Sequence, residues 1–192
     1  MRLRLNIITA STRPGRIGPM IVDWFYGLSK DDGTFDVDSV DLAAFELPVY
    51  DEPRHPRLCQ YEHEHTRRWS ASVMAADAYV FVTPEYNFGP TPALINALNY
   101  VYMEWNYKPA AFVSYGGVSG GMRGVQMTKQ TLTTLKMVPI METVTIPMVA
   151  EHLKDGKFVP SNVHTQSAST LLKELHRWAE ALKTMRTNAE MS

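Results

Sequence analysis

Five short runs of apolar and β-branched residues recur along the chain and predict β-strands. They cover residues 3–9, 35–41, 78–83, 110–115 and 138–146. The middle runs are continuously apolar, which is typical of strands buried on both faces of a sheet. The run at 35–41 instead alternates between apolar and polar positions, which indicates a strand nearer the edge of the sheet.

Between these runs, apolar residues recur at helical spacing. The first such stretch begins near Ile17 and ends at the polar, glycine-containing residues 31–33. Further helices are predicted through roughly 60–76, after residue 91 and over about 121–136. The last helix is the clearest, because it keeps one apolar stripe over several turns, formed by Ala168, Leu171, Leu172, Leu175, Trp178, Ala179, Leu182 and Met185.

Five strands that alternate with five helices predict an α/β fold, because parallel neighbouring strands need crossover helices. The expected architecture is a three-layer sandwich with a five-stranded parallel sheet and helices on both faces. Two doubly wound strand orders compete, and five strands favour the flavodoxin-like order 2-1-3-4-5 over the dinucleotide-binding order. No repeat or linker divides the chain, so residues 1–192 are expected to form a single domain.

The two most distinctive loops follow the first and third predicted strands, where this fold binds its ligands. The first loop, STRPGRIG, offers hydroxyls, free N–H groups at a helix start, and the charges of Arg13 and Arg16, which suit a phosphate. It contains neither a Walker A motif nor the GxGxxG of dinucleotide-binding proteins. A helix cap with two solvated arginines is the alternative interpretation.

The second loop, TPEYNFGPTP, is stiffened by its prolines and displays backbone N–H and C=O groups that could bind the edge of a planar heterocycle. General acid–base work by Glu85 is the alternative, but no histidine or second carboxylate lies in the neighbouring loops. We therefore expect no catalytic side chain. A third loop, at residues 114–121, carries four glycines and is either a wall for a flat ligand or a flexible connection.

Composition narrows the function classes. The 192 residues are 45% hydrophobic and 20% charged, with a net charge of −1, which argues against general attraction to nucleic acid or to an anionic membrane. No stretch approaches a membrane span, and the single cysteine, Cys59, suits a reducing cytoplasm. His63 and His65, two positions apart on a predicted helix, are not expected to share a face, so we expect a solvated surface there and no metal site.

Three segments in order along the chain, STRPGRIG, TPEYNFGPTPALINALNY and SYGG, resemble the NADPH-dependent FMN reductase family. Its members are flavodoxin-like and include quinone, chromate and azo-dye reductases. The resemblance implies that the FMN phosphate lies at Ser11, Arg13, Arg16, Ile17 and Gly18. It implies that the isoalloxazine ring lies along Pro84, Glu85, Tyr86 and Asn87, with its other border at Ser114, Gly116 and Gly117. Arg16 and Gly18 stand where the commoner family motif, SxRxxSxN, has serine and asparagine.

The implied activity is that of an FMN-dependent oxidoreductase, which transfers hydride from NADPH or NADH to a small acceptor such as a quinone, free flavin, azo compound or metal oxyanion. The resemblance also implies a homodimer or a dimer of dimers, because members of the family assemble in this way. The aromatic run Tyr100–Trp105 is either part of such a subunit contact or core packing. Two rival hypotheses are a flavodoxin-type FMN electron carrier, which tends to be strongly acidic, and a regulatory module that has lost flavin.

Overall fold

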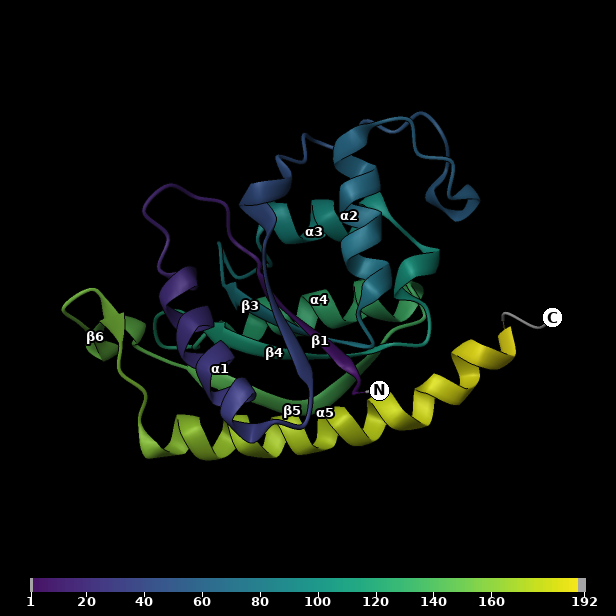
Figure 1. Ribbon diagram of the computed structural model, residues 1–192. Coiled ribbons are helices and arrows are strands. Elements are labelled where there is room, and N and C mark those ends of the chain that lie inside the picture. The colour runs from purple at the N-terminus through teal and green to yellow at the C-terminus, as the bar shows by residue number, and fades with distance from the viewer. Residues whose placement is uncertain (1, 190–192) are drawn as a thin grey trace.

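The computed structural model describes residues 2–189 and contains a five-stranded parallel sheet (Figure 1). The strand order is β2-β1-β3-β4-β5, and the predicted fold class and order are both confirmed. Every neighbouring pair in this sheet is parallel. The strands are β1 (Arg4–Thr9), β2 (Asp36–Asp41), β3 (Ala78–Pro84), β4 (Pro109–Tyr115) and β5 (Val138–Ile146).

Helices cover both faces of the sheet, as a parallel sheet requires. Figure 1 shows α1 (Gly18–Asp32) and α5 (Asn162–Ala189) on one side, and α2 (Glu64–Ala75) and α3 (Pro92–Tyr100) on the other. Helix α4 (Met122–Thr134) packs in the same apolar cluster as α2 and α3. Two clusters of buried side chains, one on each face, make up the core.

The burial of each strand follows its place in the sheet. Every residue of β3 and β4 is buried, whereas β2, at one edge, buries only its second and fifth residues. The end of α1 also follows the sequence signal, because Gly33 adopts a left-handed φ of 69° and its N–H caps the carbonyl of Ser29. These local preferences agree with the global fold and explain why the pattern was readable from the sequence.

Helix α2 begins at Glu64, later than the predicted start near residue 60. The buried carboxylate of Glu52 accepts the N–H groups of Glu62 and His63 at 2.8 and 3.0 Å, which holds these residues outside the helix. His63 therefore has extended geometry, and its ring stacks on that of His65 with centroids 5.2 Å apart. The prediction that the two histidines point apart is wrong, because it assumed that both were helical.

Three further features were not predicted from the pattern or differ from one of its interpretations. A two-stranded hairpin, β6 (Leu153–Lys154) and β7 (Lys157–Phe158), follows β5 and lies beside α1, with Phe158 packed on Trp24. Short 3-10 helices occur at Leu42–Phe45, Pro56–Leu58, Met103–Trp105 and Val149–His152. In the aromatic run Tyr100–Trp105, the side chains of Tyr100, Val101 and Trp105 are core, whereas Met103 is 49% exposed.

Lys108, just before β4, is a buried cation at the end of the sheet opposite the loops described below. Its Nζ donates to the carbonyls of Val73 and Met74 at the end of α2, at 3.0 and 3.1 Å, and to the Tyr79 hydroxyl at 3.2 Å. Burial, and then the charge of Arg186, lower the pKa of Lys108 to about 7. This group therefore contributes a pH dependence to stability.

Candidate functional site

The loops that follow β1, β3 and β4 meet at the carboxyl ends of three adjacent strands. We call them the β1 loop (residues 10–17), the β3 loop (residues 85–91) and the β4 loop (residues 116–121). The hydroxyls of Ser11 and Tyr86 share a hydrogen bond of 2.8 Å, and Thr91 donates to the carbonyl of Ala10. Ser119 donates to Glu85 at 3.0 Å. These bonds join the three loops to one another.

The predicted site residues gather at this edge of the sheet but differ in exposure. Arg13, Asn87 and Gly117 are exposed, and Arg16, Ile17, Glu85, Tyr86 and Gly116 are partly buried. Ser11, Gly18, Pro84 and Ser114 are buried. The buried residues lie beneath the surface of this edge, and the others are open to it in part or in full.

The β1 loop presents unpaired donors at the start of α1. Its one internal backbone bond runs from the Arg16 N–H to the Arg13 carbonyl, at 3.2 Å, across Gly15 with its left-handed φ of 70°. Ile17, the residue before α1, caps the helix with no side-chain hydrogen bond. The free N–H groups at a helix start, together with the helix dipole, favour an anion.

Two arginines frame this loop in different ways. The guanidinium of Arg16 forms an ion pair with Asp41 at the end of β2, through one terminal nitrogen. Its Nε is buried and has no hydrogen-bond partner among the described residues. Arg13 is exposed, and no ion pair between residues 2 and 189 involves it. Arg16 therefore keeps a donor for a ligand, and Arg13 keeps its whole head group.

Tyr115, the last residue of β4, was not singled out from the sequence. Its hydroxyl lies 2.9 Å from the position that a Cβ on Gly18 would take, directly under the start of α1. Burial, and then the neighbouring Tyr86, raise the pKa of Tyr115, while Arg16 and Arg13 act in the opposite direction. Its place in the SYGG segment gave no sign that its side chain would lie under the start of α1.

The β3 loop is a tight turn that displays its backbone. Tyr86 and Gly89 exchange two backbone hydrogen bonds, of 3.0 and 2.9 Å. Asn87 and Phe88 between them have left-handed φ values of 49° and 67°, as in a type I′ turn. Asparagine tolerates this conformation, whereas phenylalanine rarely adopts it. The guanidinium of Arg123 stacks on the exposed Phe88 ring at 4.0 Å, which helps to hold the turn.

Glu85 is occupied by structural contacts. Its carboxylate, 9% exposed, accepts hydrogen bonds from the N–H groups of Arg123 and Gly124, at 3.0 and 3.4 Å, and pairs with the Arg123 guanidinium at 3.4 Å. It thereby caps α4, whose own N-cap residue, Gly121, has no side chain to do so. All the described partners of Glu85 are hydrogen-bond donors or the Arg123 cation, so it has no acid–base partner among them.

The β4 loop is anchored at both ends. The carbonyls of Gly116 and Gly117 accept the N–H groups of Val149 and Met148, at 3.0 and 2.9 Å. A Cβ on Gly117 would meet nothing within 4 Å, whereas one on Gly120 would lie 2.5 Å from Thr145. The loop therefore packs against the end of β5 and the segment after it, and its outer side at Gly117 is open.

A groove of about 700 Å³ lies beside the β1 loop, between α3 and the segment after β2. Its lining includes Thr12, Leu42, Leu47, Val49, Pro92 and Ile95, but none of the predicted site residues. We place the candidate site at the three loops rather than in this groove. The donors and the topological switch point of the sheet both lie at the loops.

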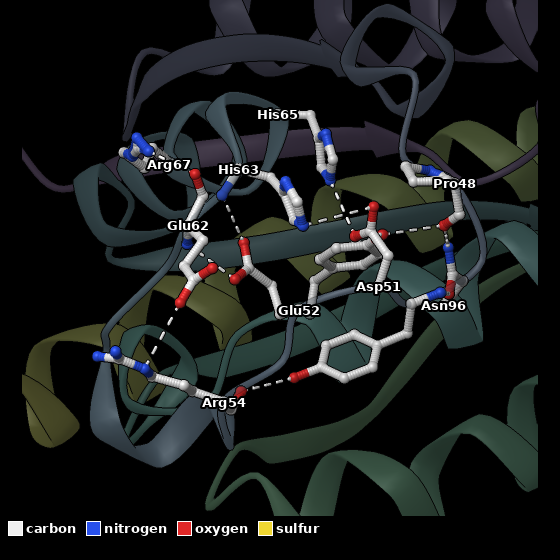
Figure 2. A network of polar contacts seen from close by, with 11 residues as sticks. Pro48, Asp51, Glu52, Arg54, Glu62, His63, His65, Arg67 and Asn96 are labelled. Carbon is white, nitrogen blue, oxygen red and sulfur yellow. Dashed lines mark hydrogen bonds and ion pairs between the residues drawn. The ribbon is translucent and has the colours of Figure 1, made fainter.

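The outer wall of the groove is held by the polar network in Figure 2. The Asn96 side chain donates to the carbonyl of Pro48 and accepts the N–H of Tyr50 at 3.0 Å. The carboxylate of Asp51 accepts from Tyr100 at 2.9 Å and lies 3.2 Å from His65 Nε2. Among residues 2–189, no histidine, cysteine or carboxylate cluster is arranged to hold a metal ion. The network fixes the segment against α2 and α3.

Known proteins share sequence and fold with this chain. The sequence model of the NADPH-dependent FMN reductase family matches residues 3–151. An NAD(P)H-dependent FMN reductase of Schizosaccharomyces pombe is 35% identical, over 92% of this chain and 89% of its own length. An NADPH azoreductase of a Bacillus species, strain OY1-2, is 30% identical over 64% of this chain and 67% of its own length.

Among solved structures, FerB, a flavoenzyme NAD(P)H:(acceptor) oxidoreductase from Paracoccus denitrificans, superposes with a TM-score of 0.75. The alignment covers 93% of this chain and 98% of FerB at 20% sequence identity, a likeness that supports the fold alone. No helix within residues 2–189 has the length and apolar character needed to cross a bilayer.

Proposed function

Because the chain belongs to the NADPH-dependent FMN reductase family, an oxidoreductase family that uses FMN with NAD(P)H, we propose that the three loops bind FMN. The phosphate lies at the β1 loop and the start of α1, at Ser11, Arg13, Arg16, Ile17 and Gly18. The ring lies along Pro84, Glu85, Tyr86 and Asn87, with Ser114, Gly116 and Gly117 on its other border. The observation that carries this proposal is the cluster of unpaired donors on the β1 loop.

The donor set fits FMN, because free N–H groups, the Arg16 Nε and the Arg13 head group all seek an acceptor. A phosphate supplies acceptors only, and arginine suits it through charge-assisted hydrogen bonds. The exposed side of Gly117 leaves room for a flat ring, which a side chain would narrow. Bound FMN supplies the redox chemistry: it accepts hydride from NAD(P)H and delivers electrons to a second small molecule.

In this proposal the protein binds and orients rather than transferring protons. Tyr86 joins the β1 and β3 loops through Ser11, and the turn at Asn87 presents the backbone at the ring's edge. Glu85 fixes the β3 loop on α4. NAD(P)H and the acceptor occupy the same open face in turn, and the acceptor is a quinone, free flavin, azo compound or metal oxyanion.

We further propose that the chain forms one domain, works in the cytoplasm and assembles as a homodimer or a dimer of dimers. The exposed apolar side chains of Phe88 (68%) and Val118 (87%), on the β3 and β4 loops, support a subunit contact beside the site. Sedimentation velocity of the purified protein tests this assembly, and a monomer at micromolar concentration would contradict it.

The function is tested by adding FMN to the purified apoprotein and following NADPH and NADH oxidation with a panel of acceptors. We expect flavin binding and acceptor-dependent oxidation of at least one nucleotide. Binding of FMN without nucleotide oxidation would instead identify an electron carrier. Absence of flavin binding would identify a module that keeps the fold without the cofactor.

A further inference from the structure

The Tyr115 hydroxyl is a buried polar group without a partner. The residue is 4% exposed, and no hydrogen bond to its Oη exists among the described residues. The oxygen atom itself is not fully enclosed by the described residues, so a ligand or a water molecule can reach it. Buried hydroxyls almost always bond to protein, water or a ligand, because leaving one unpaired is costly.

The hydroxyl lies against the first residue of α1. A Cβ on Gly18 would lie 2.9 Å from Tyr115 Oη and 3.2 Å from the Thr9 methyl group, so the hydroxyl occupies the space that glycine leaves. Helix α1 has no side-chain cap, and the nearby Nε of Arg16 is buried and unpaired. The start of α1 therefore has the Tyr115 hydroxyl packed against its first residue and Arg16, with an unpaired Nε, two residues before it.

The chemistry of this cluster selects its ligand. The arginine nitrogen and the helix N–H groups can only donate, and a tyrosine hydroxyl beside two arginines is best used as a donor. A group that accepts all of these bonds must carry several oxygens and negative charge, as a phosphate monoester does. A sugar hydroxyl or an amide would leave part of the donor set unpaired.

We propose that the Tyr115 hydroxyl donates a hydrogen bond to the FMN phosphate and makes the site select FMN over riboflavin. This inference rests on the proposed function and adds a ligand contact at Tyr115, the residue of the SYGG segment to which the family resemblance gave no role. Tyr115 reaches the phosphate from beneath, through the gap at Gly18, while Arg16 and the β1 loop bind it from above. The gap and the hydroxyl act together.

The test compares Tyr115→Phe with a matched control, Tyr107→Phe. In the wild type the Tyr107 hydroxyl lies outside the site, 3.5 Å from Lys136 Nζ. Titrating each apoprotein with FMN and with riboflavin, by quenching of flavin fluorescence, gives four dissociation constants. We expect Tyr115→Phe to weaken FMN binding about tenfold, as for a hydrogen bond to a charged group, and to leave riboflavin binding within about twofold. Tyr107→Phe should change neither constant.

A second variant guards against a general packing effect. Gly18→Ala keeps the tyrosine but places a methyl group against its hydroxyl, so it should also weaken FMN binding selectively. Equal losses for FMN and riboflavin in Tyr115→Phe, or no loss for either, would overturn the inference while the proposed function stands. A wild-type protein that binds neither flavin would overturn both.

Discussion

The contact between Tyr115 and Gly18 can be tested through stability alone, without any flavin. Gly18 has no left-handed φ, so alanine fits its backbone, and only the neighbouring atoms decide the outcome. In the wild-type background the new Cβ meets the tyrosine oxygen at 2.9 Å and the Thr9 methyl group at 3.2 Å. In a Tyr115→Phe background the nearest ring atom, Cζ, lies at 3.9 Å, an ordinary contact.

These distances set the size of the effect. Crowding a well-packed site costs about 1–3 kcal/mol, whereas replacing glycine at a compatible position gains about 0.4–1 kcal/mol by restricting the unfolded chain. We therefore expect Gly18→Ala to destabilise the wild-type apoprotein by about 1–2 kcal/mol. In the Tyr115→Phe background the same change should be close to neutral, because only the Thr9 contact remains.

The assay is a double-mutant cycle from urea unfolding of four apoproteins: wild type, both single variants and the double variant. The account predicts a coupling of about 1–2 kcal/mol, above the roughly 0.3–0.5 kcal/mol expected for independent sites. If the two single substitutions add to within about 0.5 kcal/mol, the hydroxyl does not fill the gap at Gly18. The proposed contact between Tyr115 and the phosphate would then fail as well.

Three further predictions concern the β3 loop and Lys108. Glu85→Gln should lower the free energy of urea unfolding by about 1–2 kcal/mol, because a charged cap of α4 is lost. The rate of flavin reduction by NADPH should stay within about threefold of the wild type. A rate that falls a hundredfold or more would restore Glu85 as a catalytic group. Asn87→Gly should retain FMN affinity within about threefold in fluorescence titration. Asn87→Pro cannot adopt the φ of 49° and should weaken FMN affinity at least about tenfold. Equal affinities of the two variants for FMN would refute the role of the turn. The pKa of Lys108 is lowered to about 7, below its unfolded value, so the folded state binds fewer protons above that pH and stability should rise with pH from about 7 toward 10. Lys108→Met should lack this rise. The difference in free energy of urea unfolding between variant and wild type should therefore change by about 1–2 kcal/mol between about pH 7 and pH 9. A difference that stays constant over this range would argue against the lowered pKa.

The fold was predictable because the strand pattern, the helix pattern and their alternation along the chain all indicate the same architecture. Apolar runs separated by helical stretches require crossovers, and crossovers require a parallel sheet covered on both faces. The place of the candidate site follows from topology, since loops after the first and third strands of such a sheet meet at its switch point. The prolines and Gly89 of the β3 loop indicated a stiff turn, which the paired bonds between Tyr86 and Gly89 match.

The remaining features depend on contacts between residues far apart in the chain. Tyr115 and Gly18 approach each other only because β4 ends beneath α1. Glu85, from the β3 loop, caps α4, which follows the β4 loop. The Glu52 carboxylate accepts backbone N–H groups just before α2 and so decides where that helix begins. The hairpin β6–β7 has strands of two residues each, too short to show a period.

The most direct test of the central claim is anaerobic reduction of the FMN-loaded protein by NADPH and by NADH, followed through the visible absorbance of the flavin. The account predicts full bleaching with one nucleotide consumed per flavin, and recovery of the absorbance when a quinone is added. Flavin that stays oxidised with both nucleotides, in a protein that binds FMN, would contradict the claim that these three loops make an NAD(P)H-dependent reductase.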